Sequence, residues 1–228
     1  MVEILMRLRI NYTKGGRLRF LSHLETTRAL ERLIRRADLP YAISQGFNAH
    51  MRFASGPALP VGTEGLDEFF DVFLTEYIEP DEALVRLRAA TVEEIQILST
   101  NYVDIKSKGL QATHLYETYR VVLEPSDTSA SELEKYLRGI IARGQLTKHK
   151  KGVQKIYDLS KIIKDPSSVQ VIPAKDLLLV LIKLKAGADG SVRPEDIIEA
   201  AMAERTGWKI RSVTRIRLAE TPDRDSTV

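Results

Sequence analysis

The stretch that decides the fold of the first half of the chain reads SHLETTRALERLIRRA, residues 22–37. Ser22 followed by Glu25 is the pattern of a capping box, so we expect a helix that begins here and runs to about Ala37. An i, i+3, i+4 spacing gives the helix one apolar face, formed by Leu30, Leu33, Ile34 and Ala37. Three arginines spaced i, i+4 and i+7 line up as a basic stripe on another face: Arg28, Arg32 and Arg35.

Alternating apolar residues and turn residues predict the elements around this helix. Before it we expect a β-hairpin, with strands at residues 4–12 and 17–21 joined at Lys14-Gly15-Gly16. After it we expect, in order, a strand, loop and return over residues 41–55, a strand at 69–74, a helix from Pro80 and a strand at 95–103. Two βαβ halves of this kind are typical of a ferredoxin-like module.

A similar order of elements recurs in the second half of the chain. It comprises strands at residues 116–123, 177–184 and 210–218, a helix capped by Ser129, and a helix that begins near Pro194. We therefore predict an α+β protein of two tandem ferredoxin-like (βαββαβ) modules. Their expected ranges are residues 1–108 and 109–219, followed by a flexible polar tail at 220–228.

The chain has 228 residues, of which 43% are apolar and none is cysteine. Two buried cores of ordinary size are possible at this length. Without sulfur ligands the chain cannot form disulfides, zinc–thiolate sites or iron–sulfur clusters. Residues 1–7 include an acid, and no window approaches about 18 consecutive apolar residues. We expect a soluble cytoplasmic protein with no signal peptide, no membrane span, no metal and no cofactor.

Charge is distributed unevenly along the sequence although the net charge is only +3. Residues 7–36 contain nine basic residues against Glu25 and Glu31, which leaves nine minus two, or +7. A second basic cluster covers residues 143–164, and residues 64–94 between the two are acidic. The acidic residues are Glu64, Asp67, Glu68, Asp71, Glu76, Glu79, Asp81, Glu82, Glu93 and Glu94. We expect this acidic flank to face a partner or solvent.

The arginine-rich first module suggests a cradle for RNA phosphates, because arginine suits bidentate phosphate contacts and stacking on bases. A solvated helix face is the alternative interpretation of the stripe. Backbone N–H groups at the helix N-terminus near His23 would add to the cradle, and Phe47 is the candidate for stacking on a base, or else packs. The predicted RNA-binding residues are Arg17, Arg19, His23, Arg28, Arg32, Arg35, Arg36, Gln45, Phe47, Asn48, His50, Arg52, Lys148, Lys150, Lys151 and Lys155.

Other chemistry finds little support in the sequence. The four histidines show no hydrolase-type arrangement, there is no P-loop, and no HExxH spacing suggests a metal site. We expect Phe69, Phe70 and Phe73 to be core residues rather than base-stacking residues, since no RRM signature accompanies them. Lysines 148–155 are expected to form a non-specific electrostatic arm.

Four motifs together resemble the radical SAM-linked family, domain of unknown function 2344. They are the runs RFLSHLE at 19–25, IRRADLP at 34–40, SQGFNAH at 44–50 and LPVG at 59–62. Members of that family occur fused to, or encoded beside, a radical SAM protein. A radical SAM cluster needs three cysteines, so the resemblance implies a separately encoded partner that holds it.

The first module also resembles the ferredoxin-like units of CRISPR repeat-processing endoribonucleases. Those enzymes cleave RNA without metal, through a histidine often helped by a tyrosine or lysine. That resemblance implies His23 as general base, with Tyr12 and His50 as helpers. The chain lacks an evident glycine-rich loop near its C-terminus, which those enzymes use to grip RNA.

The favoured interpretation is an RNA-binding accessory protein that presents a structured RNA to the radical SAM partner, in modification or processing of an RNA such as tRNA or rRNA. On this interpretation the chain itself is not an enzyme, and no catalytic residue is assigned. One alternative is the metal-independent endoribonuclease with His23 as base. The other is a scaffold that binds the radical SAM partner without RNA.

Overall fold

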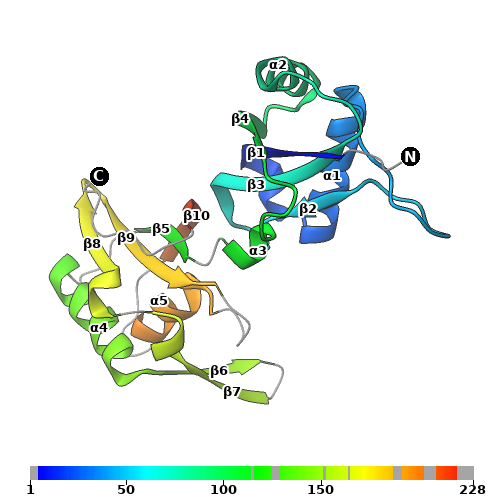
Figure 1. Cartoon of the computed structure of the whole chain (residues 1–228). Helices are drawn as coiled ribbons and strands as arrows, with labels where there is room; N and C mark the ends of the chain where they lie inside the picture. The colour runs from blue at the N-terminus through cyan, green and yellow to red at the C-terminus, as the bar shows by residue number, and fades with distance from the viewer. Residues whose placement is uncertain are drawn as a thin grey trace. The chain divides into compact units, whose positions relative to one another are not determined.

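Two units make up the chain, residues 1–114 and 115–228, and each is described by itself. The structure is a computed structural model, shown in Figure 1. It describes residues 5–113, 116–124, 129–150, 153–163, 165–186, 192–202 and 209–219. The predicted tail at 220–228 lies outside these residues.

The first unit is a four-stranded antiparallel sheet in the order β4-β1-β3-β2, with α1 and α2 as its two long helices. Its elements are β1 (Met6–Lys14), η1 (Gly16–Phe20), α1 (His23–Arg36), β2 (Phe53–Ser55), β3 (Glu64–Leu74), α2 (Pro80–Ala90), β4 (Ile95–Val103) and α3 (Leu110–Thr113). The βαββαβ order with this sheet order is the ferredoxin-like arrangement. The fold class predicted from sequence is confirmed for this unit.

The first core lies between the sheet and the helices α1 and α2. Leu8 faces Val72 and Ile10 faces Phe70 across β1 and β3, and all four side chains are fully buried. Leu30, Leu33 and Ile34 of α1 are also buried in this cluster, as the apolar spacing predicts. The capping box of Ser22 and Glu25 is present, so the predicted start of the helix is confirmed.

The predicted hairpin at the start of the chain is wrong. Residues after Gly15 form the 3-10 helix η1 instead of a second strand, and Gly16 at its start has a φ of +52°. The reason lies far away in the sequence. Both edges of β1 are occupied, by β3 on one side and β4 on the other, so no edge is left for a hairpin partner.

The second unit repeats the same topology, with an antiparallel sheet in the order β10-β5-β9-β8. Its elements are β5 (Tyr116–Glu124), α4 (Ala130–Arg143), β6 (Gln145–Lys150), β7 (Val153–Asp158), η2 (Leu159–Lys161), η3 (Pro166–Ser168), β8 (Val169–Ala174), β9 (Leu177–Lys185), α5 (Pro194–Met202) and β10 (Lys209–Ala219). Taking β5, β8, β9 and β10 as strands one to four gives the sheet order of the first unit. The protein therefore consists of tandem ferredoxin-like modules of the α+β class.

One insertion distinguishes the second unit from the first. The lysine-rich stretch that was expected to be an electrostatic arm forms the antiparallel hairpin β6–β7, in which Lys148 faces Lys155. It occupies the connection from the first helix of the unit to its second strand. Among the described residues no helix is long and apolar enough to cross a membrane.

Candidate nucleic-acid interface

The outer face of α1 carries the three arginines of the predicted stripe, and all three are exposed. Leu30 and Leu33 on the inner face fix the rotation of the helix and so fix where the arginines point. Within the described part of the chain, no ion pair joins Arg28 or Arg32 to an acidic residue. Arg35 lies 4.0 Å from Glu31, at the limit of an ion pair. The stripe formed by Arg28, Arg32 and Arg35 therefore offers positive charge to an external anion.

The C-terminal end of this stripe meets the base of the loop between α1 and β2. The Arg35 guanidinium lies 5.9 Å from the centroid of the Tyr41 ring. Tyr41 forms a bridge to Leu74 of β3, so it belongs to the interrupted first part of the second strand. Figure 1 shows the connection between α1 and β2 extending as a narrow loop away from the helix and sheet. Tyr41 thus connects the end of the stripe to the strand segment that leads into the loop.

Hydrogen bonds close this loop, which we call the 44–50 loop. The Ser44 amide donates to the His50 carbonyl at 2.8 Å, and the His50 amide donates to the Ser44 hydroxyl at 3.1 Å. The His50 Nδ1 lies 2.8 Å from the Asn48 carbonyl oxygen. Because that oxygen can only accept, the ring donates this hydrogen bond from Nδ1. Phe47 is fully exposed at the far side of the loop, beside exposed Gln45 and Asn48.

Several other arginines predicted to bind phosphate already have contacts within the protein. Arg19 pairs with Glu64 at 3.1 Å and covers the ring of Phe20. The Arg36 Nε donates to the Ala90 carbonyl at 3.1 Å, and the guanidinium of Arg52 lies 4.8 Å from the centroid of Phe73. Arg17 is exposed on η1. Arg19, Arg36 and Arg52 therefore have contacts within the protein, whereas Arg17 is exposed like Arg28 and Arg32.

The N-terminus of α1 is a poor place for a phosphate, contrary to the sequence interpretation. The Glu25 amide is bonded to the Ser22 hydroxyl, and the Ser22 amide donates to the Glu25 carboxylate at 2.8 Å. The hydrogen bond from the Ser22 hydroxyl lowers the pKa of the Glu25 carboxyl, which keeps it ionised near neutral pH. A negative charge therefore already occupies this end of the helix dipole.

The first strand directs three of the nine basic residues toward the interior, Arg7, Arg9 and Lys14, of which Arg7 and Lys14 are buried. Arg7 donates from Nε and Nη2 to Asp71 at 2.8 and 2.6 Å, and Arg9 donates to the same carboxylate at 2.9 Å. Asp71 is fully buried and Glu68 nearly so. The acidic flank is therefore not one exposed surface, as the sequence suggested, because two of its members belong to the interior. The charge runs gave no signal of this pairing between distant strands.

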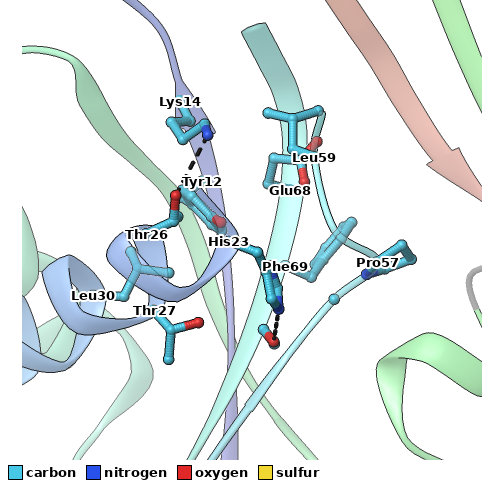
Figure 2. A pocket seen from close by; sticks show the side chains of 12 residues that line it. Tyr12, Lys14, His23, Thr26, Thr27, Leu30, Pro57, Leu59, Glu68 and Phe69 are labelled. Atoms are coloured by element: carbon cyan, nitrogen blue, oxygen red, sulfur yellow. Dashed lines mark hydrogen bonds between the residues drawn. The ribbon is translucent and has the colours of Figure 1, made fainter. Parts of the chain in front are cut away.

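A small pocket lies where α1 meets the end of the sheet (Figure 2). Its volume is about 10 Å³, the space of about one water molecule. Lys14 lies 3.4 Å from the Thr26 hydroxyl, and the His23 Nε2 lies 3.1 Å from the Ser55 hydroxyl. The pocket is lined by Tyr12, Lys14, His23, Thr26, Thr27, Leu30, Ser55, Gly56, Pro57, Leu59, Glu68 and Phe69.

This pocket brings His23 and Tyr12 together, as the endoribonuclease interpretation requires. It adds Lys14 and Glu68, which sequence reasoning did not connect with His23. However, Tyr12 is 6% exposed and Lys14 is 2% exposed, so a ribose could not reach either without a rearrangement. His50 does not line the pocket. Its ring contacts its own loop instead.

The remaining predictions fall on the aromatic strand and on the second unit. Phe70 is fully buried and Phe69 and Phe73 are half-buried, consistent with packing. Lys148 pairs with Asp196, and Lys155 lies 4.9 Å from the ring centroid of Tyr157. The side chain of Lys150 and all of Lys151 lie outside the described residues. No group of His, Asp or Glu within the described ranges is placed to hold a metal ion.

The fold and the exposed stripe define a tandem ferredoxin-like protein with a basic helix face. Residues 7–194 match the family described as "Uncharacterized protein conserved in bacteria (DUF2344)". The chain belongs to that family. No curated protein matches the sequence.

Solved structures share the fold at low sequence identity. The chain of a structure titled "Crystal Structure of a Cbf5-Nop10-Gar1 Complex" aligns with a TM-score of 0.51 at 11% identity, over 92% of this chain and 48% of that one. A second, titled "Structure of H/ACA RNP bound to a substrate RNA containing 2'-deoxyuridine", has a TM-score of 0.47 at 10% identity, over 93% and 47%. The chain thus spans about half the length of these relatives. Neither title names a CRISPR endoribonuclease.

Proposed function

We propose that this protein binds RNA through the stripe of Arg28, Arg32 and Arg35 together with the 44–50 loop. It presents that RNA to a separately encoded radical SAM enzyme. The observation that carries the proposal is the exposure of three aligned arginines, two of them without an ion pair in the described part of the chain. A helix face of this kind, next to a loop that holds an exposed aromatic ring, combines phosphate contacts with base contacts.

Burial explains why these arginines are better candidates than their neighbours. Arg7 and Arg9 share the buried carboxylate of Asp71, so moving either to an RNA would leave a buried charge without its full set of partners. Among the described residues, no buried carboxylate pairs with an arginine of the stripe. Binding of phosphate to Arg28 and Arg32 would break no ion pair of the described residues, and neutralising phosphates with these arginines favours binding by counterion release.

The second part of the proposal is that the bound RNA is presented to a radical SAM partner. It rests on the family resemblance and on the absence of cysteine from the sequence. A cluster that needs three cysteines must be held by another protein. A pull-down of the full chain with the co-expressed radical SAM protein tests this half, and RNase treatment of the same sample separates a direct contact from one bridged by RNA.

A salt series of RNA binding tests the RNA half. Fluorescence anisotropy of a labelled oligouridylate compares the wild-type chain with Arg28→Ala/Arg32→Ala/Arg35→Ala. Every phosphate that the protein no longer neutralises should reduce the slope of log affinity against log salt by about 0.7 to 1. The triple variant should therefore show a slope smaller by about 2 to 3.

A matched control removes the same charge elsewhere. Lys106→Ala/Lys135→Ala/Arg143→Ala removes three exposed positive charges, one from the β4–α3 connection and two from α4. If the control weakens binding as much as the stripe variant, the field of the whole protein is responsible and the stripe is not the site. Absence of RNA binding at moderate salt contradicts the proposal and favours the scaffold alternative.

The endoribonuclease is a second candidate because His23, Tyr12 and Lys14 line one pocket. Incubation of the purified chain with labelled cellular RNA in a metal chelator tests it directly. Cleavage that disappears in His23→Ala but persists in His50→Ala would establish this activity. Intact RNA in all three samples would eliminate it.

A further inference from the structure

The 44–50 loop places an apolar ring in water at a defined position. Phe47 is the most exposed large apolar side chain of the described residues, and every residue from Gln45 to His50 is exposed. The ring is not part of the core cluster of its unit, nor among the partly buried residues packed against that cluster. Packing within the described part of the unit therefore gives no account of an aromatic residue at this position.

The loop is held in shape although its surface is exposed. Ser44 and His50 are joined by two hydrogen bonds from backbone amides, and the adjoining pair Ile43 and Met51 forms an antiparallel bridge. Gly46 has a φ of +132°, a conformation that side chains disfavour, so the turn before Phe47 depends on glycine. A ring presented from a closed loop loses little freedom when it stacks on a ligand.

The surroundings of Phe47 determine the chemistry of that ligand. Gln45 and Asn48, both exposed, lie on either side of Phe47 in the loop, and Tyr41 before the loop contacts Arg35 of the stripe. Aromatic rings beside a positively charged track are the combination that binds single-stranded nucleic acid. In an A-form duplex the bases are stacked inside and the deep groove is too narrow for such a side chain.

We propose that the 44–50 loop is a reader of unpaired nucleotides, with Phe47 stacking on an exposed base while the stripe holds the adjacent phosphates. This inference rests on the proposed RNA binding and adds the class of RNA. The substrate is a single strand, a loop or a bulge, and a continuous duplex is a poor ligand. The amides of Gln45 and Asn48 contact the edge of the stacked base.

Comparing the protein's affinity for one RNA as a single strand and as a duplex tests the inference. The probes are a labelled oligouridylate and the duplex that it forms with oligoadenylate, each titrated with the full chain at a fixed salt concentration. The wild type should prefer the single strand. Phe47→Ala should weaken single-strand binding by about five- to 150-fold, the range found for loss of one stacked base, and leave duplex binding unchanged.

Two further substitutions separate stacking from simple apolar contact. Phe47→Trp keeps a stacking surface and should retain single-strand affinity. Phe47→Leu keeps the apolar contact but should behave like Phe47→Ala. Tyr77→Ala, which removes an exposed ring of the same unit that stacks on Tyr102 instead, serves as the matched control and should leave binding unchanged.

The outcomes distinguish this inference from the proposed function beneath it. RNA binding that depends on the stripe but is equal for duplex and single strand overturns the inference alone, as does an unchanged affinity of Phe47→Ala. An unchanged affinity of Phe47→Ala would assign the loop to a contact with a protein instead. No binding of either probe by the wild type overturns the proposed function and, with it, the assignment of the loop.

Discussion

The first unit contains two groups of arginines whose side chains lie in different places. Arg7 and Arg9 converge on the buried carboxylate of Asp71, whereas Arg28, Arg32 and Arg35 are exposed along α1. The inward group neutralises a charge that the sheet could not otherwise bury. Within the described part of the chain, the outward group pairs with no buried charge. One run of basic residues in the sequence therefore contains arginines that stabilise the interior and arginines that form a candidate binding surface.

Removing the shared carboxylate should have the largest effect on stability. Asp71→Asn leaves two arginines, one of them buried, without their negative partner, so we expect the free energy of unfolding to fall by about 3 to 5 kcal/mol. Urea denaturation measures the change. Glu76→Gln, an exposed acid of the same unit, is the control and should be neutral. A loss no larger than that of the control would show that Asp71 does not compensate the arginines.

The helix that carries the stripe should respond to loss of its cap. Ser22→Ala removes the side-chain acceptor of the Glu25 amide, and we expect a loss of about 1 kcal/mol. Ser129→Ala should have a similar effect at the equivalent capping box of α4. Thermal unfolding followed by circular dichroism compares the two. A neutral Ser22→Ala would mean that packing alone determines where α1 starts.

Glu195, a half-buried carboxyl in the second unit, sharpens the contrast with Asp71. Burial raises the pKa of Glu195, and among the described residues its Oε2 has no hydrogen-bond partner. A raised folded-state pKa means that this group stabilises the fold at low pH and that its contribution is lost as pH rises through the folded value.

Glu195→Gln should therefore be more stable than the wild type at neutral pH, with the difference shrinking toward the ordinary carboxyl pKa of 4.5. Unfolding free energies measured across this pH range check the sign. A difference that does not change with pH would show that the carboxyl titrates alike in the folded and unfolded chains.

The smallest effect on stability belongs to the exposed arginines. Arg28→Ala/Arg32→Ala/Arg35→Ala should change the free energy of unfolding by within about 0.5 kcal/mol for each residue, since alanine also suits a helix. The same urea titration as for Asp71→Asn provides the comparison. A loss equal to that of Asp71→Asn would assign the stripe a structural role.

Local signals in the sequence predicted most of the fold. The capping residues Ser22 and Ser129 and the proline at the start of α2 each mark a helix through contacts within one turn, and all three helices begin where expected. The hairpin at Gly15 failed because β3 and β4 compete for the edges of β1. Such competition between distant segments leaves no local pattern.

The candidate site was predictable to a similar degree. The i, i+4, i+7 spacing determined which arginines share a face, and the glycine beside Phe47 indicated an exposed loop. Pairing across strands was not visible in the sequence, so Arg7, Arg9 and Lys14 were counted with the exposed charge. The β6–β7 hairpin was also missed, because its lysines obscured the alternation of β6 and β7.

Photo-crosslinking tests the location of RNA on the protein most directly. The full chain is irradiated with a 4-thiouridine-containing oligonucleotide, and the crosslinked peptides are mapped by mass spectrometry. The proposal predicts crosslinks in α1 and in the 44–50 loop, with loss of the loop crosslink in Phe47→Ala. Crosslinks confined to the β6–β7 hairpin, or spread evenly over both units, would contradict it.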